Sequence, residues 1–322
     1  MPYTLVGSLP EAAVDAIWSV AWLEESSIVA GSSDASVRTY TVGDADSQLS
    51  LQHEMKGHEL AVLSVSASKD GSVVASSSMD ASIRIWDPKR GVPLGPAVID
   101  AGACKAWTVA LSPDGKVVAS GSHAGCLNLW SVETGQMLAS MPVGAGKFLM
   151  SVAFSPGGEH VACGAVDGGV HMFDLRAETQ SAELPSPHLF GSHVGPSGPS
   201  AVRAVAFASG GGGVLASGAD DARLNLYDVR ARAAQASMEG HTSWVLGASF
   251  APGDAAIASC SADRSVRVWD IGQRQCVQAL GDAHSDQAWG IAFDPSGAQR
   301  KRFALVGDDT TLRCYEERGE AS

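Results

Sequence analysis

The amino-acid sequence predicts an all-β fold in which seven similar units of short strands form one closed ring. Two observations support this prediction. A segment that ends in an aromatic residue recurs along the whole chain, and glycine is frequent, at 36 of 322 residues. So many glycines favour many turns between short strands over a few long helices.

The repeated segment is clearest at 76–87, SSSMDASIRIWD, and one aromatic residue marks each of its copies. The seven aromatic residues are Tyr40, Trp86, Trp130, Phe173, Tyr227, Trp269 and Tyr315. Their spacings are 46, 44, 43, 54, 42 and 46 residues, so the period is near 44. The longest spacing contains the Pro/Gly/Ser-rich stretch 184–200, which we interpret as a loop inserted between repeats and not as a linker between domains.

The order within each repeat is typical of short antiparallel strands. Apolar and polar residues alternate, as in SIRIW at 82–86, and turns such as SPDG at 112–115 separate the alternating runs. The period, the turns and the aromatic–Asp ending resemble the four-stranded blade of WD-repeat β-propellers, which has about 40–45 residues. The sequence therefore predicts a single seven-bladed WD-repeat β-propeller domain over residues 1–322.

The two ends of the chain are expected to complete one blade. The sequence stops seven residues after Tyr315, after only three strands of the last repeat, whereas YTLVGSL at 3–9 is an additional strand before the first repeat. We expect residues 3–9 to join the last blade, which closes the ring and removes an open sheet edge. Two domains are not expected, because neither half of the chain would close a ring alone.

Composition excludes several classes of function. Thirty-five acidic against 22 basic residues give a net charge of −13, which argues against nucleic acid or an anionic membrane as a direct ligand. No apolar run is long enough to span a membrane, and no secretory signal is seen at the start. No metal-ligand spacing is present, so neither a metal nor another cofactor is expected.

The cysteines indicate a reducing compartment. They are Cys104, Cys126, Cys163, Cys260, Cys276 and Cys314. None forms a C-x-x-C pair and most lie in apolar segments, which is typical of reduced, buried thiols in a cytoplasmic or nuclear protein.

The second and sixth repeats each contain a Ser–His–Asp set that resembles the triad of a hydrolase. With the aromatic residue that follows, the two sets are His58, Ser76, Asp80 and Trp86, and His241, Ser259, Asp263 and Trp269. A catalytic triad is normally unique, but this set occurs twice and no G-x-S-x-G elbow surrounds either serine. In WD-repeat blades such residues resemble a buried hydrogen-bond network, so we predict a structural role for all eight and no enzymatic activity.

Two further motifs are weaker. GAGKF at 144–148 resembles a phosphate-binding loop but lacks its upstream glycine and its following Ser or Thr. QRKRF at 299–303 is a short basic cluster in a predicted turn. It is interpreted as a solvated loop, with nuclear targeting or a nucleic-acid contact as the alternative.

One position in the innermost strand of each repeat carries a large side chain. This position follows the first buried apolar residue of the strand and is expected near one rim of the central channel. Its occupants are Trp18, Leu63, Trp107, Met150, Arg203, Leu246 and Trp289. Because exposed apolar side chains mark binding sites and Trp, Met and Arg are enriched at interfaces, we predict a partner-docking face. The expected ligand is an apolar segment with an acidic group that reaches Arg203; the alternative is that these side chains only fill the core.

Several segments resemble one family more closely, the small WD-repeat subunit of the superkiller complex. They include AIWSVAW at 16–22, the SHAG turn at 122–125, which lacks an aspartate, and GKF at 146–148. The chain departs from that family in the stretch 184–200, in a longer turn at 299–302 and in Ala13, which stands where a histidine is expected.

The resemblance implies a non-catalytic scaffold for protein–protein interaction that is monomeric when alone. Its implied partners are a helicase and a tetratricopeptide-repeat subunit, in a complex that supports exosome-coupled 3'–5' mRNA decay in the cytoplasm. In animals and plants, similar proteins also join the RNA polymerase II-associated factor complex, which acts in transcription elongation and histone modification in the nucleus. The alternative is a WD-repeat scaffold of another assembly, such as a ubiquitin ligase adaptor or a ciliary or signalling complex.

Overall fold

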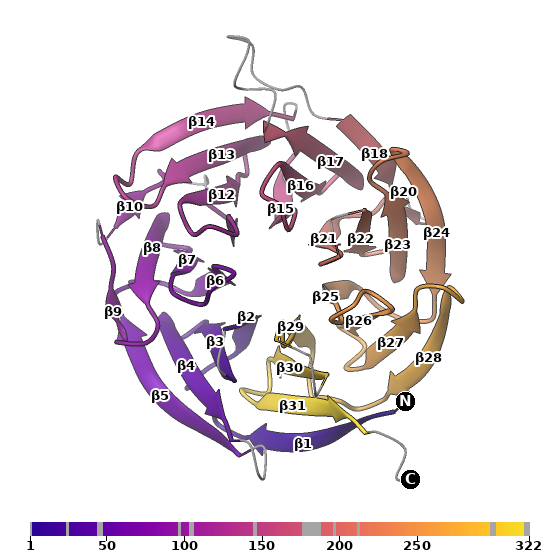
Figure 1. The fold of residues 1–322 in the computed structure, drawn as a ribbon, viewed down its shortest axis with the longest axis horizontal. Helices are drawn as coiled ribbons and strands as arrows, with labels where there is room; N and C mark the ends of the chain where they lie inside the picture. Colours follow the sequence, from indigo (N-terminus) through magenta and orange to yellow (C-terminus); the bar gives the residue numbers. More distant parts are fainter. Residues whose placement is uncertain are drawn as a thin grey trace.

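The computed structural model describes residues 2–23, 26–43, 48–95, 98–102, 106–143, 147–175, 188–195, 198–210, 213–296 and 301–318. Within these ranges the chain forms β-strands and no α-helix, and the strands form seven blades around a central channel and one additional two-stranded sheet (Figure 1). No described helix is therefore available to cross a membrane. The prediction of an all-β, seven-bladed propeller is confirmed.

The first three blades follow one another around the ring. From the inside outward, blade 1 consists of β2 (Ile17–Trp22), β3 (Ser27–Ser32), β4 (Ser36–Val42) and β5 (Leu49–Lys56). Blade 2 consists of β6 (Val62–Ala67), β7 (Val74–Ser78) and β8 (Ser82–Asp87), with two short strands on β8, β9 (Val92–Pro93) and β10 (Ile99–Asp100). Blade 3 consists of β11 (Thr108–Leu111), β12 (Val117–Gly121), β13 (Cys126–Ser131) and β14 (Met137–Pro142).

The remaining blades repeat this order. Blade 4 consists of β15 (Leu149–Phe154), β16 (His160–Ala165), β17 (Gly169–Asp174) and β18 (His188–Ser192). Blade 5 consists of β21 (Val202–Phe207), β22 (Val214–Ala219), β23 (Arg223–Asp228) and β24 (Ala233–Glu239). Blade 6 consists of β25 (Val245–Phe250), β26 (Ala256–Ser261), β27 (Val266–Asp270) and β28 (Gln275–Leu280). Blade 7 consists of β29 (Ala288–Phe293), β30 (Arg302–Gly307), β31 (Leu312–Glu317) and β1 (Tyr3–Leu9).

The stretch 184–200 is more ordered than the predicted loop. His188–Ser192 is β18, which pairs antiparallel with β17 as the outer strand of blade 4. A small hairpin of β19 (Val194–Gly195) and β20 (Gly198–Pro199) follows it. The edge of β17 would otherwise lack a partner, so the blade recruits a strand even from a Pro/Gly/Ser-rich segment. Residues 184–187 lie outside the described ranges.

The start of the chain closes the ring, as predicted. β1 pairs antiparallel with β31, the last strand, and lies at the outer edge of blade 7 (Figure 1). Tyr3 also joins blade 6, because its amide donates to Gln278 Oε1 (2.7 Å) and its carbonyl accepts from Gln278 Nε2 (2.8 Å). The first strand therefore holds two neighbouring blades together.

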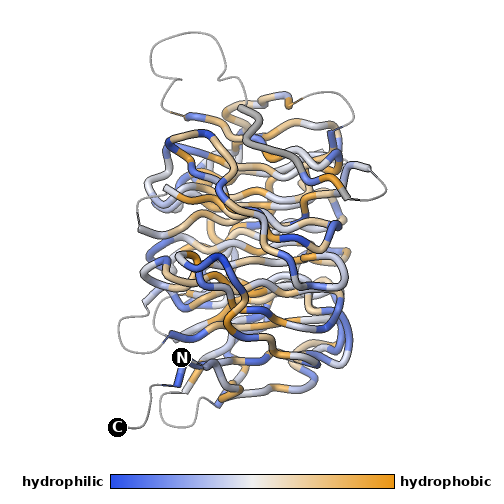
Figure 2. Tube along the Cα trace, turned by 90° about the vertical axis from the view of Figure 1, so that its right-hand side faces the viewer, coloured by the Kyte–Doolittle hydropathy of each residue, from blue (hydrophilic) through white to orange (hydrophobic). Residues whose placement is uncertain are grey.

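The hydrophobic core lies between neighbouring blades. One buried cluster, for example, joins Val29 and Met55 of blade 1 to Val74 and Trp86 of blade 2. In side view, apolar residues lie mainly along the strands and hydrophilic residues mainly at the turns (Figure 2). Each blade buries one face against the next, so the ring is stabilised as a whole.

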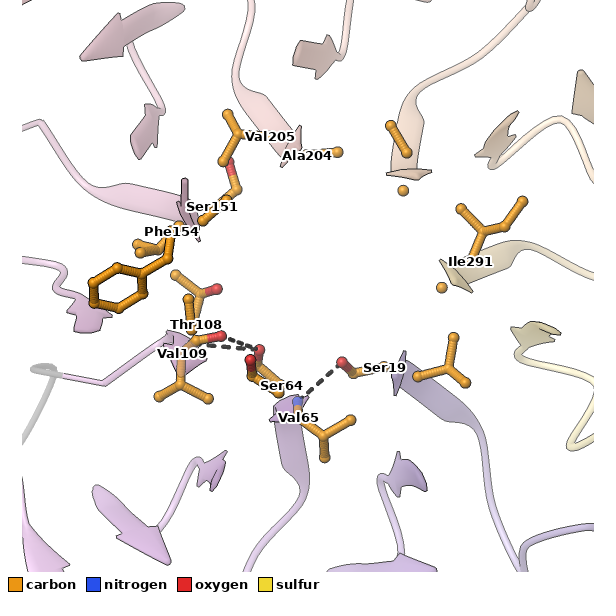
Figure 3. A pocket seen from close by; sticks show the side chains of 18 of the residues that line it. Ser19, Ser64, Val65, Thr108, Val109, Ser151, Phe154, Ala204, Val205 and Ile291 are labelled. Atoms are coloured by element: carbon orange, nitrogen blue, oxygen red, sulfur yellow. Dashed lines mark hydrogen bonds between the residues drawn. The ribbon is translucent and has the colours of Figure 1, made fainter. Parts of the chain in front are cut away.

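The inner strands approach each other closely around the channel, which requires small residues there. Ser19 Oγ accepts from the amide of Val65 in the next blade (3.0 Å), a contact visible in Figure 3. At the junction of blades 7 and 1 a glycine serves instead, because a Cβ on Gly290 would lie 3.2 Å from the amide nitrogen of Val20. This close packing fixes the positions of the residues that line the channel.

Candidate partner-binding face

Each repeat carries one large side chain in its innermost strand, at the position predicted near the rim of the channel; we call it the ring residue of that blade and its place the ring position. A β-bulge at the start of the inner strand presents this side chain. In six blades the pairing of the first two strands shifts by one residue there, for example between Ile17 and Ser19 in blade 1. The residues left out of the pairing are Trp18, Leu63, Met150, Arg203, Leu246 and Trp289. In blade 3 the equivalent Trp107 directly precedes β11, and its amide donates to the carbonyl of Gly121 (3.0 Å). A bulge changes the direction in which a side chain points, which explains how these large residues face the channel rim at the start of each inner strand.

All seven ring residues line one cavity, of about 690 Å³, that follows the axis of the propeller. Figure 3 shows smaller residues of the same inner strands, such as Ser64, Thr108 and Ile291, around this channel. The ring residues lie where the inner strands begin, at one end of the propeller, and they define the rim face. The structure thus brings the predicted positions together.

Exposure differs around the rim face. Trp107 is 38% exposed, and five other members are half-buried. Leu246 is only 7% exposed and belongs to the core, so it presents little surface to a partner. For Leu246 the structure therefore agrees with the alternative named above, a side chain that fills the core.

Aromatic contacts between neighbouring blades arrange the exposed side chains. Trp18 and Trp289 have ring centroids 6.2 Å apart, and Trp18 Nε1 donates to Asp308 Oδ1 (3.3 Å). Trp107 packs edge-to-face against Phe148 (5.1 Å). Each pair joins side chains from two neighbouring blades, which limits the motion of the exposed indole rings.

The guanidinium of Arg203 lies between an acidic and an aromatic side chain. It binds Asp220 through two nitrogens, with 3.0 Å between Nη2 and Oδ2, and lies over the Trp244 ring at 4.4 Å from the centroid. The charge of Arg203 is therefore compensated within the chain. The sequence analysis expected an acidic group of the ligand at Arg203; in the structure the carboxylate of Asp220, at the adjacent strand end, already binds the guanidinium.

Two aromatic residues of the rim face, Phe148 and Trp244, were not among the predicted positions. Each stands two residues before a ring position and reaches sideways to the ring residue of the preceding blade, Trp107 for Phe148 and Arg203 for Trp244. The sequence contained a signal for both residues. Among the described residues that stand two positions before a ring residue, only those of blades 4 and 6 are aromatic, in KFLMSVAF at 147–154 and SWVLGASF at 243–250.

Comparison with known proteins agrees with this architecture. The sequence pattern of the family described as "WD domain, G-beta repeat" matches residues 49–87, 100–131, 137–174 and 233–270. The chain is 32% identical over 308 residues to WD repeat-containing protein SL1-17 of Schistosoma mansoni, covering 94% of this chain and 95% of that protein. The chain belongs to the WD-repeat protein family. It is also 31% identical over 270 residues to WD repeat-containing protein VIP3 of Arabidopsis thaliana, covering 78% of this chain and 79% of that protein. WD-repeat propellers generally act as non-catalytic scaffolds that bind protein partners.

Buried hydrogen-bond networks link strands to turns within the blades of this WD-repeat protein. In blade 2, His58 Nδ1 lies 3.0 Å from Asp80 Oδ2 and Nε2 lies 2.7 Å from Ser76 Oγ, which also accepts from Trp86 Nε1 (2.8 Å). Blade 6 repeats the arrangement in His241, Asp263, Ser259 and Trp269, with distances of 2.9, 2.8 and 2.8 Å. Both serines are 0% exposed, so no substrate reaches their hydroxyls.

The pKa shifts of these WD-repeat networks fit a structural role. Burial alone would raise the pKa of Asp80, but hydrogen bonds from Ser82 and from the amide of Glu59 lower it to about 2. Burial lowers the pKa of His58 and outweighs the opposing effect of Asp80. A neutral imidazole next to a charged carboxylate is therefore the state at neutral pH, with Nδ1–H donating to Asp80.

Two further blades of the WD-repeat ring contain a related pair that the sequence analysis missed. In blade 5, His193 Nδ1 lies 2.9 Å from Asp221 Oδ2 and Nε2 lies 2.7 Å from Ser217 Oγ. In blade 7, His284 Nδ1 lies 2.7 Å from Asp309 Oδ1. Neither histidine follows a glycine, and each stands 28 or 25 residues before its aspartate instead of 22, which hides the pattern in the sequence.

Removing one carboxylate should destabilise the WD-repeat ring. We expect Asp263→Ala to lower the free energy of unfolding by about 2–4 kcal/mol, because His241 Nδ1 and the amide of Thr242 lose their buried acceptor. Asp80→Ala should act similarly in blade 2. Asp286→Ala, at an exposed aspartate, is the control and should change the value by less than about 0.5 kcal/mol. Chemical denaturation followed by circular dichroism measures all three; an unchanged midpoint for both network variants would contradict the structural role.

The remaining motifs of this WD-repeat protein have local partners where the structure describes them. Lys147 of the 144–148 stretch pairs with Asp167 (3.2 Å), and Lys301 of the basic turn pairs with Glu317 (3.5 Å). Arg302 is buried against Asp294 (3.0 Å). Residues 144–146 and 299–300 lie outside the described ranges, as does Cys104. The five described cysteines are free, and the described residues contain no cluster of His, Cys, Asp and Glu that would hold a metal ion.

Proposed function

We propose that this WD-repeat protein is a non-catalytic scaffold subunit of the superkiller complex that binds partner segments on the rim face. In that assembly it supports exosome-coupled 3'–5' mRNA decay in the cytoplasm. A second role, in the RNA polymerase II-associated factor complex, places it in transcription elongation and histone modification in the nucleus. The choice of the superkiller complex rests on the SHAG turn at 122–125 and the GKF start of the fourth repeat.

The observation that carries the scaffold role is a group of exposed apolar side chains at one end of the propeller. Besides Trp107, exposed Met79 and Val166 lie there, because their amides donate to the carbonyls of Ala61 and Phe148 just before the inner strands of blades 2 and 4. Exposed apolar groups at one surface are costly in water and favour a protein partner.

The charge of the chain supports a division of labour in the proposed complex. A net charge of −13 disfavours direct contact with RNA. The tetratricopeptide-repeat subunit and the helicase, the proposed partners, would then hold the RNA while this chain holds the partners together.

Affinity purification followed by mass spectrometry tests the proposal. The tagged protein, expressed in the organism that encodes it, should recover a helicase and a tetratricopeptide-repeat protein in amounts comparable to its own. Recovery of components of a ubiquitin ligase or of a ciliary or signalling complex, without those two proteins, would contradict the superkiller assignment. It would support the second candidate, a WD-repeat scaffold of another assembly.

A further inference from the structure

Trp244 is an exposed aromatic side chain of the rim face that lies outside the channel. It precedes β25 in blade 6, is 44% exposed, and its carbonyl accepts from the amide of Ala262 (3.0 Å). The channel lining includes Arg203 and Leu246 but not Trp244. The indole ring therefore lies beside the channel, against Arg203, and is accessible from the rim face.

Arg203 supports the Trp244 ring from the neighbouring blade. Its guanidinium is anchored by two bonds to Asp220 and lies 4.4 Å from the ring centroid. A planar guanidinium stacks on an aromatic face, and an anchored one fixes the orientation of the indole before a ligand arrives. Ordering the ring in advance reduces the entropy lost on binding.

Three cations of the rim face in blades 4 to 6 are paired within the chain. Besides the Arg203–Asp220 pair, Arg264 of blade 6 lies 3.8 Å from Asp282, and Lys147 of blade 4 lies 3.2 Å from Asp167. Among the described residues, these cations of the rim face near blades 4 to 6 thus each have an acidic partner. Since Asp220 already binds the guanidinium beneath the indole ring, the exposed ring is suited to an uncharged group of the ligand and not to a carboxylate.

We infer that Trp244 contacts the bound partner and takes an uncharged apolar side chain of it, and that Arg203 is a positioning residue for Trp244. This inference rests on the proposed function, because it assumes that a partner segment docks on the rim face. It assigns Arg203 an indirect role: the guanidinium acts through the indole and has no contact with an acidic group of the ligand.

A double-mutant cycle tests the inference with the purified tetratricopeptide-repeat subunit as the probe, by isothermal titration calorimetry at two salt concentrations. Trp244→Ala should weaken binding at least about tenfold. Arg203→Lys keeps the charge but loses the planar fork, so it should also weaken binding, by several-fold. In the Trp244→Ala background, Arg203→Lys should add nothing, because both substitutions remove the same contact.

The controls separate the outcomes. Val277→Ala, on the outer strand β28 of the same blade, removes an apolar side chain that is even more exposed (54% against 44%) and should bind like the wild type. Thermal melting checks folding, and Trp244→Phe replaces Trp244→Ala if the latter unfolds, with an intermediate loss of affinity expected. Additive effects, or wild-type affinity for Arg203→Lys together with a salt-sensitive loss for Arg203→Ala, would show that Arg203 binds an acidic group and would overturn the inference. If the wild type binds and Trp244→Ala binds equally well, only this inference fails; if the wild type does not bind, the proposed function fails.

Discussion

Replacement of Tyr3 by alanine should lower the free energy of unfolding by about 3–5 kcal/mol, the range for truncating a buried aromatic residue. Tyr3 is 3% exposed, and its ring lies 5.2 Å from Phe303 and 5.9 Å from Phe293, centroid to centroid. The loss should be large because this residue belongs to the strand that closes the ring. Burial also raises the pKa of the Tyr3 phenol, so the side chain stays neutral and no charge is buried with it. Chemical denaturation followed by circular dichroism gives the value.

The matched control for Tyr3 lies two residues away. Leu5 belongs to the same strand, β1, but is 50% exposed, so Leu5→Ala should change the free energy of unfolding by less than about 0.5 kcal/mol. Equal effects of the two substitutions would indicate that β1 acts only through its backbone pairing with β31. A negligible effect of Tyr3→Ala would contradict closure of the core by this side chain.

The parts of the fold that repeat were predictable from the sequence. Seven aromatic residues at a period near 44 imply seven blades, and the strand at 3–9 without a repeat of its own implies closure at the last blade. These inferences succeed because a blade cannot bury its faces alone, so each copy requires neighbours on both sides. The ring position was predictable for the same reason, since the bulge recurs at equivalent residues of six blades.

The features that depend on one blade alone were not predictable. β18 has no repeat-like sequence, and only the open edge of β17 explains its presence. The Arg203–Asp220 pair joins the first strand of a blade to the turn after its second strand, and a charge pattern along the sequence does not reveal which aspartate faces a given arginine. His193 and His284 lack the preceding glycine that identified His58 and His241, although they bind the equivalent aspartates.

The largest effect on binding is expected when two indole rings on different sides of the rim face are removed together. Trp107 is 38% exposed, so a partner can bury about 100 Å² of its surface, which corresponds to about 2.5 kcal/mol. Trp289, half-buried in blade 7 beside Trp18, contributes a second contact far from the first. Since distant sites act independently, Trp107→Ala with Trp289→Ala should weaken binding of the tetratricopeptide-repeat subunit at least about a hundredfold. Titration calorimetry or recovery in affinity purification measures the loss.

The specificity of that effect is checked with exposed apolar residues elsewhere on the propeller. Leu138 and Val277 are 57% and 54% exposed on the outer strands β14 and β28, so a Leu138→Ala, Val277→Ala double variant removes apolar surface without touching the rim face. It should bind like the wild type, and both double variants should melt cooperatively. Full recovery of the partner by the tryptophan variant would refute docking on the rim face. An equal loss for both variants would indicate binding to exposed apolar surface in general. A site on the rim face predicts instead that only substitutions at the start of the inner strands weaken binding.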